Sequence, residues 1–143
     1  MASGETDRMP KLFVSQPDNC PPLHIALNYG FSELSNIKYA PTVAEGTTIK
    51  NPIRLTEMVQ AIRETGGTTV TLSEPEIIDA TMKLSQSGLY VEPTCAHAAA
   101  GMKKLITSGT IRSDEETIVL LTGTGLKSTF FYAEQFESKS IGS

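Results

Sequence analysis

A hydroxyl residue and two glycines follow an apolar run near the end of the sequence. The run covers residues 117–121 (Thr-Ile-Val-Leu-Leu) and continues into Thr122, Gly123, Thr124 and Gly125. It predicts a buried strand, and the glycines after it predict a turn. Open α/β sheets bind ligands at the carboxyl ends of their strands, where glycine lets the backbone approach a ligand closely. The Thr122 hydroxyl is therefore a candidate ligand-binding group, unless it simply ends the strand.

The rest of the sequence alternates between strand and helix patterns. We expect strands at residues 11–15, 68–72, 89–91 and 117–121, and helices at about 22–29, 55–65, 74–87 and 94–108. The second helix carries Leu55, Met58, Val59 and Ile62 at the spacing of one buried stripe. This order of elements predicts an α/β fold with three layers (αβα) and a mostly parallel sheet.

Local signals mark two helix starts and one long loop. Ser73 and Glu76 have the spacing of a capping box, and Thr94 has a hydroxyl that could cap the last helix. Residues 31–54 have neither a helical nor an alternating period. A long loop inside a compact domain is more often functional than idle, so Glu45 within it is a candidate site residue. The plain alternative is a solvated acid.

Composition excludes several classes of protein. The 143 residues suit one domain, and 39% apolar and 20% charged content is ordinary for a globular chain. A net charge of −4 with scattered lysines and arginines offers no basic face for nucleic acid, and no apolar run is long enough to cross a membrane. Cys20 and Cys95 lack the neighbours of a zinc site, so we expect reduced thiols in a cytoplasmic protein and no metal ligands.

Three segments together resemble the C-terminal part of a known enzyme family. They are residues 40–46 (Ala-Pro-Thr-Val-Ala-Glu-Gly), 88–101 (from Gly-Leu-Tyr-Val-Glu-Pro-Thr to Ala-Gly) and 120–127 (Leu-Leu-Thr-Gly-Thr-Gly-Leu-Lys). Their order and spacing are similar to those of fold-type II pyridoxal-phosphate (PLP) enzymes, the tryptophan synthase β superfamily, and closest to threonine synthase. The match covers roughly residues 11–128. It departs at Ser128, where the threonine synthase pattern has Asp.

The resemblance implies roles for four residues at a PLP site. Thr122 matches the hydroxyl residue that meets the pyridine nitrogen, and Gly123 follows it in the turn. A hydroxyl bonds this nitrogen without protonating it firmly, which favours elimination and replacement over transamination. Thr94 matches a position close to the cofactor ring. Glu45 could line the cofactor pocket, bind the cation found in some relatives, or be a solvated acid.

The family's PLP-binding lysine and phosphate-binding loop have no counterpart here. Lys50 and Lys127 lie nearest the matched segments, but neither has the Ser-x-Lys-Asp context of that lysine. His24 and His97 fall in predicted helices without a paired acid, so we expect them to be structural. We therefore assign no catalytic residue, and we do not expect this chain alone to bind PLP.

The sequence thus predicts part of the large domain of a PLP enzyme. We expect residues 1–10 to be a disordered lead or an artificial addition, 11–129 the α/β domain portion, and 130–143 a C-terminal tail. The complete enzyme would be a threonine-synthase-like lyase that performs elimination or replacement on an amino-acid substrate such as O-phosphohomoserine.

The expected partner of this chain is the missing N-terminal half of the enzyme or a second copy of the chain. We expect a homo-oligomer. The alternatives are one half of a split enzyme, or a non-catalytic fragment or degenerate paralogue that self-associates or binds a partner.

Overall fold

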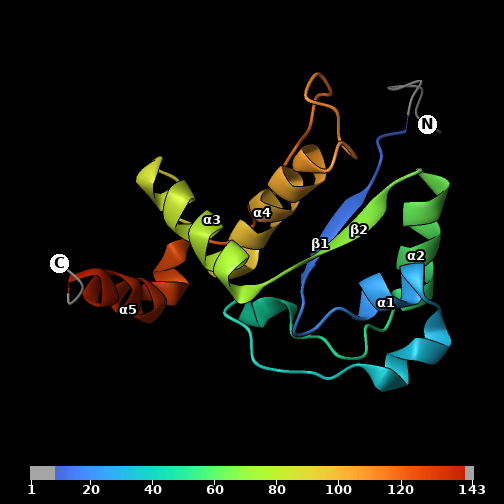
Figure 1. Cartoon of the computed structure of the whole chain (residues 1–143), viewed down its shortest axis with the longest axis horizontal. Helices are drawn as coiled ribbons and strands as arrows, with labels where there is room; N and C mark the ends of the chain where they lie inside the picture. Colours follow the sequence, from blue (N-terminus) through green and yellow to red (C-terminus); the bar gives the residue numbers. More distant parts are fainter. Residues whose placement is uncertain (1–8, 141–143) are drawn as a thin grey trace.

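The computed structural model describes residues 9–140 of the chain, which form an α/β arrangement (Figure 1). The elements in chain order are β1 (Phe13–Pro17), α1 (Pro22–Asn28), the 3-10 helices η1 (Phe31–Asn36) and η2 (Glu45–Thr47), α2 (Leu55–Glu64), β2 (Thr68–Leu72), α3 (Glu74–Gln86), α4 (Pro93–Thr107), the 3-10 helix η3 (Gly125–Ser128) and α5 (Thr129–Ser140).

Strands β1 and β2 form a parallel sheet between two layers of helices. Phe13 lies opposite Thr68, and the register continues to Pro17 opposite Leu72. Helices α1 and α2 cover one face, while α4 crosses the other with α3 packed against it (Figure 1). Alternate residues of β1 face the two layers, because Val14 packs against the α1–α2 cluster and Ser15 contacts α4. The predicted three-layer α/β fold with a parallel sheet is confirmed.

Two apolar clusters hold these layers together. The first joins α1 to α2 and contains Leu23, Ala26, Leu55, Val59 and Ile62, all buried. The predicted stripe on the second helix therefore faces the core. The second cluster joins β2 to α3, α4 and the long loop, and contains Leu72, Ile77, Ala100 and Ala44. The loop thus lies next to α4, although the two are distant in sequence.

The predicted helix boundaries hold where local chemistry sets them. The Glu76 carboxylate accepts a hydrogen bond from the Ser73 backbone N–H (2.8 Å), which is the carboxylate's bond in the capping box at the start of α3. It accepts another from the Ser73 hydroxyl (2.9 Å). Gly88 and Gly109 follow α3 and α4 with φ of +91° and +75°, a conformation that glycine adopts without strain.

Three strand predictions need correction. β1 begins at Phe13, two residues later than expected, and residues 89–91 contribute only an isolated bridge from Val91 to Thr124. The predicted strand 117–121 forms no strand, and Ile118 and Leu120 are 83% and 73% exposed. Its apolar residues have strand character, but a strand needs a partner, and the described residues place none beside it.

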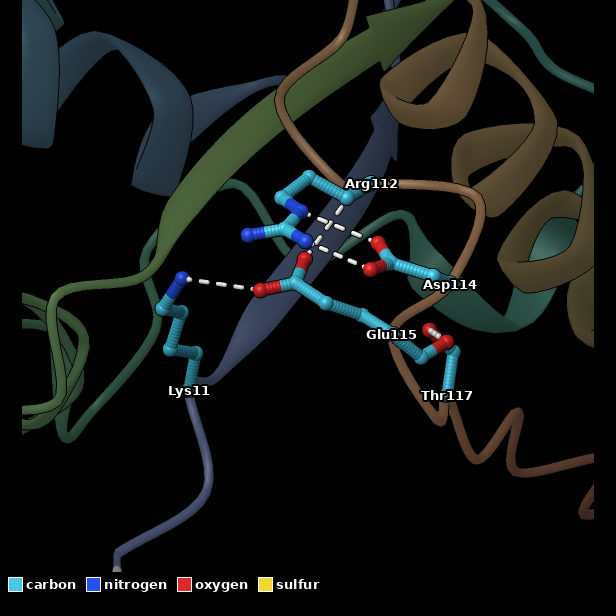
Figure 2. A network of polar contacts seen from close by, with 5 residues as sticks. All are labelled: Lys11, Arg112, Asp114, Glu115 and Thr117. Carbon is cyan, nitrogen blue, oxygen red and sulfur yellow. Dashed lines mark hydrogen bonds and ion pairs between the residues drawn. The ribbon is translucent and has the colours of Figure 1, made fainter.

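A polar network fixes the loop that leads from α4 to this segment (Figure 2). Glu115 accepts a hydrogen bond from the Arg112 backbone N–H (2.9 Å) and pairs with Lys11, which precedes β1 (3.4 Å). The Arg112 guanidinium binds Asp114 through two nitrogens. These groups are exposed, so each pair contributes little to stability. Their effect is to tie the start of residues 117–121 to the edge of β1.

The expected domain limits place a lead at residues 1–10 and a tail at residues 130–143. Residues 1–8 of the expected lead lie outside the described residues. Most of the tail after residue 129 forms helix α5, which no sequence signal predicted. Within residues 9–140, no helix has the length and apolar character needed to span a bilayer.

Gly101 of α4 lies directly against the sheet, and we predict that Gly101→Ala destabilises the chain. A Cβ at this position would lie 2.7 Å from the Ser15 Cβ, so the helix must move away from β1. Overpacking of this kind costs about 1–3 kcal/mol, against a gain of about 1 kcal/mol from helix propensity. Urea unfolding should show a net loss, whereas Thr107→Ala, at an exposed site on α4, should be close to neutral. Equal stability of the two variants would refute the close contact.

His97 predicts a pH dependence of stability. Its Nδ1 lies 2.6 Å from the Ser15 hydroxyl, and its buried Nε2 has no hydrogen-bond partner. Burial lowers the pKa of His97 below 6.5, so the folded state binds fewer protons than the unfolded state. Its contribution to stability is present above pH 6.5 and is lost as the pH falls from 6.5 through the lowered pKa.

The free energy of unfolding should therefore fall as the pH drops from 7.5 to 5.5. His97→Gln should flatten this slope. His24, whose pKa burial also lowers, remains in that variant and accounts for the slope that is left. An unchanged slope in His97→Gln would contradict the account.

Candidate functional site

The three segments singled out in the sequence meet at the N-terminus of α4. Residues 90–95 lead into that helix and form its first turn, the loop at residues 44–47 packs beside it, and residues 122–125 contact residues 90–95. The segments are separated by up to about 80 residues in sequence, so tertiary packing alone brings them together. The predicted residues Glu45, Thr94, Thr122 and Gly123 all belong to this cluster.

The Gly-rich segment is held by backbone hydrogen bonds to the segment before α4. The Glu92 N–H donates to the Gly123 carbonyl (3.4 Å), and the Gly125 N–H donates to the Tyr90 carbonyl (3.0 Å). Between them, Val91 and Thr124 form the antiparallel bridge. We call residues 90–92 and 123–125 the site ribbon. Because Thr122 immediately precedes Gly123, the ribbon fixes where its side chain lies.

Thr122 is exposed, and its hydroxyl lies next to a buried thiol. The distance from Thr122 Oγ1 to Cys95 Sγ is 3.4 Å, and Cys95 is only 3% exposed. The same thiol lies 3.8 Å from a carboxylate oxygen of Glu92. A thiol is a weak hydrogen-bonding group, so the Thr122 hydroxyl retains capacity to bond a ligand atom.

Gly123 lies in close contact with the Glu92 side chain, and its φ is not in the left-handed region. A Cβ at this position would lie 1.9 Å from the Glu92 carboxylate and 3.0 Å from its Cγ. The Glu92 side chain therefore lies against the backbone of the turn. Any larger residue at 123 would displace Glu92 and, with it, the carboxylate near Cys95.

Thr94 does not cap α4, which corrects the prediction. The helix begins two residues earlier, with Glu92 as N-cap and Pro93 in the first turn, a position that suits proline. The Thr94 hydroxyl instead accepts a hydrogen bond from the Gly46 N–H (3.1 Å). A Cβ on Gly46 would lie 2.8 Å from the Thr94 methyl group. Thr94 thus joins the long loop to α4.

Glu45 begins the short helix η2 beside this contact, and its side chain is exposed. No group of three His, Cys, Asp or Glu side chains with metal-binding geometry occurs among the described residues. The backbone after Glu45 is nevertheless fixed, because the Thr47 hydroxyl and N–H both bond the Ala44 carbonyl. The backbone at Glu45 is thereby held near the N-terminus of α4.

Of the four basic residues considered in the sequence, only Lys127 adjoins this cluster, because its N–H donates a hydrogen bond to the Thr124 carbonyl (3.4 Å). Lys50 is exposed and lies over the Tyr39 ring, 5.3 Å from its centroid, and Lys127 is an exposed residue of η3. His24 bonds the Thr69 hydroxyl beneath α1 (2.9 Å), and His97 contacts the sheet. The contacts of His24 and His97 are those of residues that pack helices against strands.

Sequence reasoning missed two residues of the site. The sequence predicts only a reduced thiol at Cys95, although this residue follows Thr94 in the matched segment and contacts Thr122. Tyr132 of α5 donates a hydrogen bond from its phenol to the Val91 carbonyl (2.7 Å) in a buried position. No periodicity or motif marks Tyr132, because its role depends on how α5 folds back onto the ribbon.

The arrangement fits one edge of a planar, nitrogen-containing ring. An exposed hydroxyl on a rigid turn can bond a ring nitrogen, and Gly123 leaves the backbone beside it uncovered by a side chain of its own. The described residues near the ribbon include no lysine suited to covalent attachment of PLP. The residues present therefore fit the pyridine side of PLP.

Comparisons with known proteins identify the family of the chain. The profile of the family described as pyridoxal-phosphate dependent enzyme matches residues 1–123, which include all four predicted site residues. The threonine synthase of Methanosarcina acetivorans is 35% identical over 125 residues, which cover 87% of this chain and 31% of that protein. The threonine synthase of Methanocaldococcus jannaschii is 32% identical over 126 residues, with 87% and 31% covered.

A plant relative extends the comparison. Threonine synthase 2, chloroplastic, of Arabidopsis thaliana is 32% identical over 127 residues, which cover 88% of this chain and 25% of that protein. The chain thus spans about a quarter to a third of the length of these relatives and matches their C-terminal part. Since the family profile covers most of the chain and the site segments lie within it, this chain belongs to the pyridoxal-phosphate dependent enzyme family of fold type II.

Proposed function

We propose that this chain forms the pyridine-nitrogen side of the PLP site in a threonine-synthase-like lyase, with Thr122 as the residue that bonds the ring nitrogen. The observation that carries the proposal is the exposed Thr122 hydroxyl, held by the site ribbon and lying 3.4 Å from the buried Cys95 thiol. Gly123, Thr94 and Glu45 are the proposed neighbours of the cofactor, because they surround the same helix terminus.

The proposed reaction is an elimination or replacement on an amino acid, such as O-phosphohomoserine. When bound, PLP withdraws electrons from the amino-acid substrate. Thr122 would orient the ring through a hydrogen bond and, unlike a carboxylate, would not hold a proton firmly on the nitrogen. We place this function in the cytoplasm, in keeping with the two buried free cysteines.

The rest of the site would come from another polypeptide segment. The PLP-binding lysine, the phosphate-binding loop and the substrate carboxylate site have no counterpart among the described residues. Ile118 and Leu120 are exposed and apolar in the segment that leads to Thr122, which supports a partner that covers them. That partner is either the N-terminal part of the enzyme, on the same or a separate chain, or a second copy of this chain.

The same exposed segment supports the alternative proposal, a non-catalytic module that self-associates or binds a partner. The two proposals differ at Thr122. The lyase proposal requires its hydroxyl, whereas association through the side chains of Ile118 and Leu120 does not.

The test joins this chain to the N-terminal part of the Methanosarcina acetivorans threonine synthase that lies outside the match. In that fusion, Thr122→Val keeps the side-chain shape and removes the hydroxyl. Loss of a buried hydrogen bond costs about 1–3 kcal/mol, so PLP affinity or turnover should fall roughly ten- to a hundredfold.

Thr124→Val is the matched control, two residues further along. Its hydroxyl accepts a hydrogen bond from the Leu126 N–H at the start of η3, so this variant loses a local cap while Thr122 is unchanged. We expect the smaller effect from Thr124→Val. If Thr122→Val left PLP affinity and turnover unchanged while Thr124→Val abolished them, the proposal would have named the wrong hydroxyl. If both were silent in a fusion that binds PLP, the proposed role of this segment would be refuted.

A further inference from the structure

Helix α5 lies outside the family match and yet contacts the candidate site. The match ends at residue 123, and α5 spans Thr129–Ser140. The helix projects from the rest of the described chain in Figure 1, and its N-terminal turn adjoins η3, which follows the Gly-rich segment. One residue, Tyr132, makes its buried contact with the site ribbon.

Tyr132 contacts residues 90–92 of the site ribbon in two ways. Its phenol donates a hydrogen bond to the Val91 carbonyl (2.7 Å), and its ring packs on the Tyr90 ring with 4.6 Å between centroids. Tyr132 is only 4% exposed, so water cannot replace the phenol at that carbonyl without opening the contact. Burial raises the pKa of Tyr132, which keeps its phenol protonated and able to donate at neutral pH.

Tyr90 carries this contact to the Gly-rich segment. A Cβ on Gly125 would lie 2.9 Å from three carbons of the Tyr90 ring, so the ring lies directly against the Gly125 backbone. The Gly125 N–H also donates to the Tyr90 carbonyl (3.0 Å). Tyr90 therefore contacts both the Tyr132 ring and the Gly125 backbone.

We propose that Tyr132 is a positioning residue: through Tyr90 and Val91 it holds the site ribbon closed and so fixes Thr122 against Cys95. The role of Thr122 towards the cofactor rests on the proposed function, but the effect of Tyr132 on the ribbon does not. Helix α5 lies outside the family match, and its contact with Tyr90 and Val91 stabilises the turn that follows Thr122.

The experiment measures opening of the ribbon in the full chain, without any ligand. Tyr132→Phe removes only the hydrogen bond to Val91, and Tyr132→Leu also removes the ring contact with Tyr90. Phe130→Leu is the matched control, because Phe130 is an aromatic residue of the same helix that is 86% exposed.

Two readouts report on the ribbon separately from the rest of the fold. The first is hydrogen exchange at the Glu92 and Gly125 amides, compared with exchange at β2. The second is the rate at which a thiol reagent labels Cys95, compared with Cys20, which is fully buried in another part of the fold.

We expect Tyr132→Phe to speed exchange at Glu92 and Gly125, and labelling of Cys95, by about tenfold, the effect of losing one buried hydrogen bond. Tyr132→Leu should have a larger effect. β2, Cys20 and the Phe130→Leu variant should stay at wild-type rates. Unchanged rates at the ribbon in both Tyr132 variants would overturn the proposal, and so would an equal rise at β2, which would indicate general destabilisation.

The same variants separate this inference from the proposed function. Suppose Tyr132→Phe loosens the ribbon while Thr122→Val is silent in the fusion described above. The positioning of the ribbon by Tyr132 is then supported, and the cofactor role of Thr122 is refuted. If Thr122→Val is damaging and the ribbon is unaffected by Tyr132→Phe, the proposed function stands and the inference fails.

Discussion

The backbone pairing between residues 90–92 and 123–125 is the constraint on which the candidate site depends. Two hydrogen bonds, which together make up the Val91–Thr124 bridge, bring the Gly-rich turn onto the segment that leads into α4. Gly123 and Gly125 permit this approach, because a Cβ at either position would meet Glu92 or the Tyr90 ring. Without that pairing, Thr122 would end an exposed segment with no fixed relation to Cys95 or Thr94.

The sequence predicted those elements whose signals are local. The stripe on α2, the capping box of α3 and the β-branched run of β2 each specify an element within a few residues, and each was found as expected. The strand 117–121 was wrongly predicted, because strand formation needs a partner that the described residues do not provide. The Thr94 cap was wrong because Glu92 and Pro93 already start the helix, which leaves the hydroxyl to bind Gly46.

The site shows the same division between local and tertiary information. Family resemblance predicts Thr122, Gly123, Thr94 and Glu45 as site residues, and the fold gathers their segments around one helix terminus. The contacts of Cys95 and Tyr132 could not be predicted, because each joins segments about 27 and 41 residues apart without any repeating pattern. The apolar residues Ile118 and Leu120, in the segment before Thr122, remain exposed in this fold.

The most direct test of this account is PLP retention, measured by absorbance after gel filtration. The isolated chain and its fusion to the N-terminal part of the Methanosarcina acetivorans threonine synthase would be incubated with PLP and compared. The account predicts that the fusion retains an equimolar amount of PLP and the isolated chain retains none, because this chain supplies only the pyridine side of the site. Stoichiometric retention by the isolated chain, or a folded fusion that retains no PLP, would contradict it.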